Sequence, residues 1–192
     1  MKIVLGSKSA RRSELLSLIG YDFYVDFVDI DETIHDYKNP KDYVQKVVQR
    51  KGVAVYNKHE NELIICADTI VVIDDIILNK PKDTNDAKLM IKLINNRAHS
   101  VMTAVYIKYL NYEKTFVEET IVYIDNISEE EIEDYISTNE PYDKAGGYAI
   151  QGKFAKHIKK IDGDFYNVMG LPINRLNNEI KEIELTRTKK NG

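Results

Sequence analysis

The spacing of apolar residues near the N-terminus predicts a strand followed by a helix. Residues 2–5 form a short, largely aliphatic run that is typical of a strand. After the sequence GSKS, apolar side chains recur at the spacing of one helical face, at Leu15, Leu16, Leu18 and Ile19. We expect this helix to begin near Ser9 and to end at Gly20, because glycine commonly follows the last turn of a helix.

A second helix is marked by its first two residues. Asn39 followed by Pro40 is typical of an N-cap and a first helical position, and the helical pattern continues to about Asn57. One charged residue lies in the apolar face, which comprises Val44, Val47, Val48, Lys51 and Val55. A buried amine must either extend its charge to water or meet an anion, and the pattern alone leaves both open.

A β-rich segment follows, with one carboxylate inside it. Residues 62–74 are mostly aliphatic or β-branched and predict a strand, which Asp68 interrupts. The dipeptide Asp74-Asp75 predicts a turn into a short strand at residues 76–78. Burying a carboxylate costs several kcal/mol unless it is paired, hydrogen-bonded or bound to metal, so Asp68 needs a physical reason.

A third helix and a hairpin are predicted next. Thr84 is a suitable cap for a helix whose apolar residues are Leu89, Met90, Leu93 and Ile94. Residues 99–110 and 114–125 alternate apolar and polar side chains, which is the pattern of half-buried strands. Because a short connection around Asn111-Tyr112 joins them, we expect a hairpin.

Further elements are predicted in the C-terminal third. Ser128 and Glu131 have the spacing of a capping box, which predicts a short helix after them. Residues 154–161 predict a strand, and the segment NVMGLP leads into a helix that begins near Pro172. Residues 181–192 form a charged end that we expect to fray.

Strands and helices alternate irregularly, and at least one hairpin is present. This pattern favours an α/β (or α+β) fold with a mixed, twisted sheet flanked by helices. The chain has 192 residues, of which 43% are hydrophobic, so it can bury one core or two small lobes that share a cleft. We expect a single domain over residues 1–192.

Composition narrows the class of protein. The only cysteine, Cys66, has no partner for a disulfide, and this favours a reducing, cytoplasmic location. No apolar run approaches the roughly 20 residues of a membrane span, and the N-terminus lacks the pattern of a signal peptide. A net charge of −4 argues against broad nucleic-acid binding. Residues 1–16 are nevertheless locally cationic, which suits a small anionic ligand.

The segment DKAGGYAIQG at residues 143–152 departs from the apolar periodicity of the chain. Gly146 and Gly147 allow positive φ and a close approach of backbone, as a ligand-lining loop requires. A tight turn would also explain a glycine pair. Gln151 adds a side-chain amide that could contact the edge of a nucleobase, and Asp143 could pair with Lys144 to hold the loop.

Charged side chains elsewhere suggest an anionic ligand. Arg11 and Arg12 lie in the first turn of the predicted first helix, where free N–H groups already favour an anion. They could equally be solvated surface residues. Asp68 could be a general base, a metal ligand or a structural acceptor. Glu32, in an acidic loop, could be solvated or could bind metal, and Lys80 before a proline is not informative alone.

Together these residues suit a polyphosphate bound with a divalent cation. The cations Arg11, Arg12, Lys51 and Lys80 would neutralise phosphate oxygens. Carboxylates at Glu32 and Asp68 would bind Mg²⁺ or activate water.

Seven segments in order match one known family. They are SARRSELL at 9–16, IDE at 30–32, ADTIVV at 67–72, NKPKD at 79–83, HSVMTAV at 99–105, EPYDKAGGYAIQG at 140–152 and NVMGLP at 167–172. The chain therefore resembles the Maf family of cytoplasmic nucleoside triphosphate pyrophosphatases. This resemblance covers residues 3–176 and implies a Maf/ITPase-like fold with two lobes around a nucleotide-binding cleft.

The resemblance also implies an activity and roles for residues. It implies hydrolysis between the α and β phosphates, with Asp68 as the catalytic proton acceptor and with a divalent cation, Mg²⁺ or Mn²⁺, at Glu32 and Asp68. Residues that match the phosphate- and metal-handling positions are Ser9, Arg12, Glu32, Lys51 and Lys80. The discriminating positions Arg12, Thr69 and Gln151 resemble the branch that acts on dTTP and UTP, and a homodimer is implied.

Alternatives remain open at this point. The chain could prefer another base, such as that of 7-methyl-GTP or CTP, or act on modified pyrimidine nucleotides. It could also be a non-catalytic nucleotide-binding regulator of cell division, because the family name is tied to septum formation. A nucleic-acid-binding function fits the sequence least well.

Overall fold

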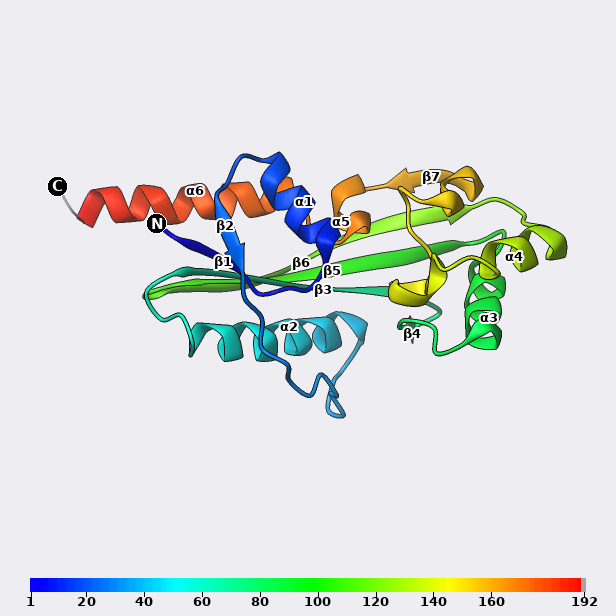
Figure 1. Cartoon of the computed structure of the whole chain (residues 1–192), viewed down its shortest axis with the longest axis horizontal. Helices are drawn as coiled ribbons and strands as arrows, with labels where there is room; N and C mark the ends of the chain where they lie inside the picture. The colour runs from blue at the N-terminus through cyan, green and yellow to red at the C-terminus, as the bar shows by residue number, and fades with distance from the viewer. Residues whose placement is uncertain (191–192) are drawn as a thin grey trace. The chain divides into compact units, whose positions relative to one another are not determined.

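Seven strands form one mixed sheet in the computed structural model, which describes residues 1–190 and the side chains of residues 1–187 (Figure 1). The strand order is β2-β1-β3-β5-β6-β7, and β4 pairs with β3. The strands are β1 (Ile3–Leu5), β2 (Phe23–Val25), β3 (Leu63–Ile73), β4 (Ile76–Leu78), β5 (Ala98–Tyr109), β6 (Tyr112–Ile124) and β7 (Ile158–Asp162).

Helices lie between several of these strands and after the last strand within residues 1–190. The α-helices are α1 (Ala10–Leu18), α2 (Pro40–Tyr56), α3 (Thr84–Ile94), α4 (Glu129–Ile136), α5 (Phe165–Met169) and α6 (Ile173–Lys190). Three 3₁₀ helices are η1 (Pro141–Asp143), η2 (Ala145–Gly147) and η3 (Lys153–His157). None of the helices in this described part of the chain has the length and apolar character needed to cross a bilayer.

The pairing directions confirm the predicted mixed sheet. β1 pairs in parallel with both β2 and β3, with Ile3 opposite Phe23 and Leu63. β4 pairs with β3 in antiparallel fashion, and β7 does so with β6. The fold is therefore a mixed α/β fold.

The chain divides into two compact units. The first unit comprises Met1–Asp68, Thr103–Val117 and Gly170–Gly192, and the second comprises Thr69–Met102 and Glu118–Met169. Strands β3, β5 and β6 contribute residues to both units.

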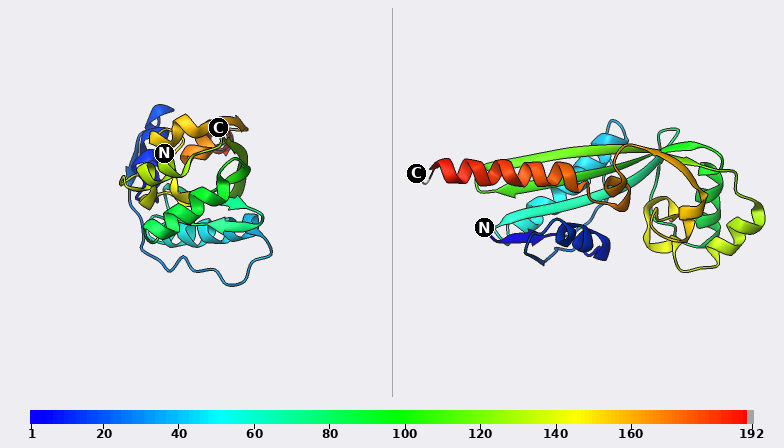
Figure 2. Two further views of the ribbon diagram at one scale, coloured as in Figure 1. Left: turned by 90° about the vertical axis from the view of Figure 1, so that its right-hand side faces the viewer. Right: turned by 90° about the horizontal axis from the view of Figure 1, so that it is seen from above.

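In the first unit, helices cover both faces of the sheet. α2 lies on one face, and α1 and α6 lie on the other (Figures 1 and 2). α2 approaches the sheet closely at Gly52, where an added Cβ would lie 2.0 Å from the ring of Tyr106. The core of this unit is aliphatic and includes Leu5, Leu16, Val48, Ile64 and Leu176.

In the second unit, α3 and α4 pack together beside a separate core. That core includes Val71, Ile91, Val122, Ile132 and Tyr148. Ion pairs from Lys88 and Lys92 to Glu129, at 2.6 and 2.9 Å, join the exposed sides of the two helices.

Two predicted helix starts are confirmed in atomic detail. The Asn39 side chain accepts a hydrogen bond from the Asp42 N–H at 2.9 Å, and Pro40 is the first helical residue. Ser128 and Glu131 form the predicted capping box at the start of α4. Both motifs use contacts within one turn, which is why sequence alone predicted them.

Several local predictions are wrong. Asp83, not Thr84, caps α3, because its side chain accepts from the Asp86 N–H at 2.8 Å and Thr84 is already helical. The predicted hairpin of β5 and β6 is present, but its turn lies at Leu110-Asn111, one residue earlier than predicted, with Leu110 at φ +52°. The pattern also predicted neither β2 nor α5.

The predicted strand at residues 154–161 begins later than expected. Residues 153–157 form η3, and pairing of β7 with β6 begins at Ile158. The cause is Glu140, whose carboxylate accepts the backbone N–H groups of Lys153 at 2.8 Å and Phe154 at 3.3 Å. This long-range contact holds the backbone in a turn.

Candidate active site

The loop between β1 and α1 carries the first expected site residues. Ser9 is the N-cap of α1, but its side chain does not cap the helix. Its N–H instead donates to Ser7 Oγ at 3.2 Å. Arg11 and Arg12 lie in the first turn, which contains no acidic residue. The start of α1 is therefore cationic, as the sequence predicted.

Arg12 connects the first and the last of the three chain segments that make up the first unit. Its Nε donates to the Gly170 carbonyl at 2.9 Å, and its Nη1 donates to Ser7 Oγ at 3.1 Å. Burial of this guanidinium lowers the pKa of Arg12, and nearby Asp68 opposes that effect. Arg12 therefore joins α1 to the segment before α6. Ser7 is not among the residues predicted from sequence, and only its place in the loop after β1 could have indicated it.

Three of the predicted residues meet in one cluster in the first unit. Lys51 Nζ donates to Asp68 Oδ1 at 2.7 Å and lies 2.9 Å from Glu32 Oε2. The Lys51 and Asp68 side chains are each 17% exposed, and that of Glu32 is 55% exposed. The amine in the apolar face of α2 thus meets an anion, which was one of the two outcomes left open.

The carboxylates keep Lys51 charged despite its burial. Burial alone would lower the pKa of Lys51, but the charges and hydrogen bonds of Asp68 and Glu32 outweigh it, so the pKa is raised. An ammonium that stays protonated here can attract the oxygens of a bound anion as well as those of the two carboxylates.

Asp68 is placed differently from the prediction. It was expected to interrupt a strand, but β3 is continuous from Leu63 to Ile73 with Asp68 in its middle. The strand tolerates the carboxylate because the side chain is partly exposed and meets Lys51. A satisfied charge leaves the backbone pairing intact.

The other expected residues lie in the second unit. Thr69 follows Asp68 in β3 and is partly buried, whereas Lys80 and Gln151 are exposed. The Gly146 N–H donates to the carbonyl of Asn79 at 3.1 Å. The loop that carries Lys80 is thus bonded to the glycine loop that leads to Gln151.

The glycine loop has the backbone that its sequence predicted. Gly146 and Gly147 have φ of +68° and +75°, and a Cβ at Gly146 would lie 2.8 Å from Val71. Both positive φ and close approach are therefore present. Lys144 pairs with Asp143 and also donates to the Glu140 carbonyl at 2.9 Å, so this pair holds the loop as proposed from sequence.

A buried polar pair supports the same loop. His99 Nε2 and Tyr148 Oη lie 2.6 Å apart, and both side chains are buried. Burial lowers the pKa of His99 to about 4 and raises that of Tyr148. His99 is therefore neutral at pH 7. Both residues stood in motifs read from the sequence, but nothing in the sequence indicated that they pair.

The oxygens of Glu32 and Asp68 are the donor type that a hard divalent cation prefers. Both face a single cationic atom, Lys51 Nζ. Within the described residues, no group of three or more His, Cys, Asp and Glu side chains converges in a way that could hold a metal. Mg²⁺ is commonly held by one or two carboxylates together with substrate phosphates, so the two residues fit such an ion.

Sequence comparison identifies the family. The profile described as "Maf-like protein" matches residues 2–183. The chain belongs to the Maf family. The predicted resemblance is thus confirmed over nearly the whole chain.

Curated relatives are similar along almost their entire length. A protein of Geobacillus sp. (strain WCH70) named "dTTP/UTP pyrophosphatase" is 43% identical, over 95% of this chain and 98% of its own. A protein of Thermoanaerobacter sp. (strain X514) with the same name is 48% identical, over 92% of this chain and 93% of its own.

Solved structures show a weaker likeness. A nucleoside-triphosphatase / dITP/XTP pyrophosphatase of Mycobacterium abscessus has a TM-score of 0.44 and 11% identity, covering 66% of this chain and 76% of its own. The Ham1 protein of Staphylococcus aureus has a TM-score of 0.45 and 14% identity, covering 65% and 72%. The family assignment rests on sequence alone.

Proposed function

We propose that this Maf protein hydrolyses dTTP and UTP between the α and β phosphates. The products are the nucleoside monophosphate and pyrophosphate. The observation that carries the proposal is the cluster of Lys51, Asp68 and Glu32, which sets a carboxylate base beside a partly buried cation. The names of relatives that are 43% and 48% identical support the choice of substrate.

Asp68 acts as the proton acceptor. Lys51 holds Oδ1 through a hydrogen bond of 2.7 Å, and Oδ2 takes the proton from a water molecule. The water oxygen forms a bond to the α-phosphorus while the bond from that phosphorus to the bridging oxygen breaks. The electron pair of the broken bond leaves with pyrophosphate. Lys51 fixes the orientation of the base throughout.

Cationic side chains bind the phosphates and stabilise the charge on the departing pyrophosphate. Arg11 and Arg12 act at the start of α1, where the helix dipole adds to their effect. Ser9 contributes its hydroxyl there, and Lys51 and Lys80 add further positive charge.

Glu32 and Asp68 would hold a divalent cation, Mg²⁺ or Mn²⁺, to which the phosphates of the nucleotide add further ligands. When bound, such an ion neutralises phosphate charge and polarises the α-phosphorus. The half-exposed Glu32 side chain keeps one carboxylate accessible to an incoming ion, whereas Asp68 is fixed by Lys51.

We propose that Arg12, Thr69 and Gln151 select the base, as the family resemblance implies. Gln151 presents an exposed amide at the end of the glycine loop. The hydrogen bond from the Gly146 N–H to the Asn79 carbonyl holds this loop in place. An amide can pair with the oxygen and N–H edge of uracil or thymine. We further propose that the protein is cytoplasmic, as its single, buried and free cysteine suggests. The family resemblance supports a homodimer. We propose that it binds neither nucleic acid nor membrane.

A substrate panel with isotope labelling tests the proposal. Wild-type protein is incubated with dTTP, UTP, CTP and 7-methyl-GTP in H₂¹⁸O with Mg²⁺ or Mn²⁺. We expect pyrophosphate from dTTP and UTP, with ¹⁸O in the monophosphate, because water attacks the α-phosphorus. Faster turnover of CTP or 7-methyl-GTP would contradict the base assignment. Tight dTTP binding without turnover would favour a non-catalytic regulator instead.

A further inference from the structure

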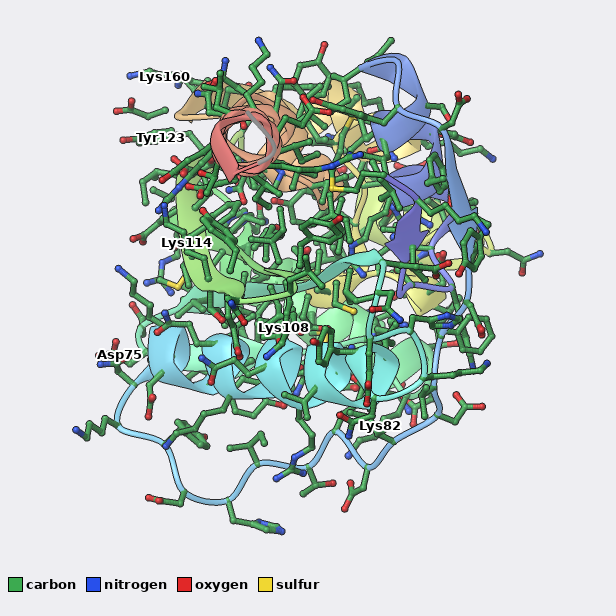
Figure 3. The ribbon with its side chains drawn as sticks, turned by 90° about the vertical axis from the view of Figure 1, so that its left-hand side faces the viewer. Asp75, Lys82, Lys108, Lys114, Tyr123 and Lys160 are labelled. Atoms are coloured by element: carbon green, nitrogen blue, oxygen red, sulfur yellow. The ribbon has the colours of Figure 1, made fainter. Side chains whose placement is uncertain are left out.

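The loop at residues 26–39 carries Glu32 and contains neither helix nor strand. Figures 1 and 3 show it, in blue, passing around the outward side of α2 before it enters that helix. A segment without regular hydrogen bonding keeps its place only through contacts with its neighbours. The position of Glu32 therefore depends on what holds this loop against α2.

Side chains of α2 and of the residues just after it hold the loop along its length. Lys58 pairs with Asp26 at 2.5 Å, near the start of the loop. Lys46 Nζ donates to the carbonyl of Asp36 at 2.7 Å, near its end. The earlier loop residue, Asp26, contacts the later residue, Lys58, and the later loop residue, Asp36, contacts the earlier one, Lys46. The loop therefore runs antiparallel to α2. Glu32 lies between these two attachments.

Arg50 makes the attachment at Glu32 itself. Its Nη1 donates to the Asp31 carbonyl at 3.0 Å and to the Thr33 carbonyl at 2.9 Å. A guanidinium Nη carries two hydrogens, and here each meets a carbonyl that flanks Glu32. The Thr33 N–H also donates to Asp31 Oδ1 at 2.9 Å, which closes a tight turn around Glu32. Arg50 and Lys51 are adjacent in α2. One helical turn therefore contacts both the backbone around Glu32, through Arg50, and the Glu32 carboxylate, through Lys51.

We propose that Arg50 is a positioning residue for the Glu32 carboxylate and thereby sets the affinity of the site for a divalent cation. This inference rests on the proposed function. Arg50 is exposed, and its hydrogen bonds go to the backbone on each side of Glu32, next to the Asp31 carboxylate that its charge also attracts. Loss of its two hydrogen bonds frees that backbone, and the carboxylate then spends less time beside Asp68.

Lys46 supplies a matched control. It lies one helical turn before Arg50, carries the same charge and donates to a carbonyl of the same loop, but that carbonyl belongs to Asp36. Replacing either residue with Gln removes one positive charge from α2 and its attachment to the loop, which is two hydrogen bonds for Arg50 and one for Lys46. Lys46→Gln also removes the ion pair of Lys46 with Asp42 at 3.0 Å. A difference between the two variants therefore reports on the place of attachment.

Mn²⁺ binding, followed by the electron paramagnetic resonance signal of the free ion, measures the effect without turnover. We expect Arg50→Gln to weaken Mn²⁺ binding by roughly tenfold, as is usual when the partner of a metal-binding group is removed, and Lys46→Gln to leave it nearly unchanged. In the Glu32→Gln background, Arg50→Gln should have no further effect, because Arg50 acts through that carboxylate. Arg50→Lys should restore part of the affinity.

Equal Mn²⁺ affinities for Arg50→Gln and Lys46→Gln would overturn the proposal, as would additive effects in the Glu32→Gln background. Wild-type protein that binds no Mn²⁺ would overturn it as well. Pyrophosphate release from dTTP by the wild type, measured in parallel, separates the two hypotheses. Turnover with no role for Arg50 rejects the positioning alone, whereas absence of turnover rejects the proposed function.

Discussion

At the residue scale, Lys51 links two carboxylates that lie far from it in sequence. The pattern of α2 predicted that this amine either reaches water or meets an anion. It could not predict Asp68 and Glu32 as the partners, because their approach depends on β3 and on a loop without regular structure. Candidate residue types were thus predictable from sequence, whereas their contacts required the fold.

Replacing Lys51 tests this contact through stability. Lys51→Met should leave the partly buried Asp68 carboxylate without its partner and lower the free energy of unfolding by about 1–3 kcal/mol. Adding Asp68→Asn should recover much of that loss without restoring turnover. Urea unfolding measures the effect, with the exposed Lys41→Met as the control on the same helix. A loss no larger than that of the control would refute the contact's role.

His99 predicts a dependence of stability on pH. Its pKa is lowered to about 4 in the folded protein, so the folded state keeps it neutral while the unfolded state binds a proton below pH 6.5. Its contribution should be fully present above pH 6.5 and should be lost as pH falls toward 4, by up to roughly 3 kcal/mol.

Unfolding at a series of pH values in wild type and in His99→Gln measures this contribution. The variant should lack the decline between pH 6.5 and 4 that is due to His99. The exposed His35→Gln serves as control and should keep it. Identical pH profiles for wild type and His99→Gln would show that burial does not hold His99 neutral.

At the scale of elements, local signals predicted what local contacts determine. The Asn39 cap and the box of Ser128 and Glu131 use atoms within one turn, and both were read correctly. The strand predicted at residues 154–161 failed because Glu140 binds the backbone of Lys153 and Phe154 from a distance. No pattern within that segment carries this information.

The glycine loop offers a test at this scale. Gly146→Ala should destabilise more than Gly20→Ala, although both residues have positive φ. The cost of positive φ, about 1–2 kcal/mol, is common to both. At Gly146 the new Cβ would also lie 2.8 Å from Val71, whereas at Gly20 nothing lies within 4 Å.

We expect this crowding to add roughly 1–3 kcal/mol at Gly146, measured by chemical denaturation. Gly146→Ala should also slow dTTP turnover, because the same loop is bonded to the residue before Lys80. Equal losses of stability in the two variants would mean that Val71 yields to the new methyl group.

At the scale of the whole molecule, the sequence predicted a mixed α/β fold, and the structure confirms it. Hydrophobic patterning predicted most strands because their buried residues form continuous, largely aliphatic runs in the sequence. It missed the three-residue strand β2, because none of its residues is fully buried and the sequence therefore shows no buried apolar pattern there. The chain passes from the first unit to the second between Asp68 and Thr69, so the proposed base and a proposed specificity residue are consecutive.

The central claim is that Asp68 accepts the proton from the water that attacks dTTP. Pyrophosphate release from dTTP by wild type, Asp68→Asn and Asp74→Asn tests it most directly. Asp74→Asn is the control, because Asp74 lies in the turn after the same strand and asparagine tolerates its φ of +50°. We predict that Asp68→Asn loses at least about a hundredfold in kcat while Asp74→Asn retains normal turnover, since an amide cannot take up the proton. Near-normal pyrophosphate release by folded Asp68→Asn would contradict the claim.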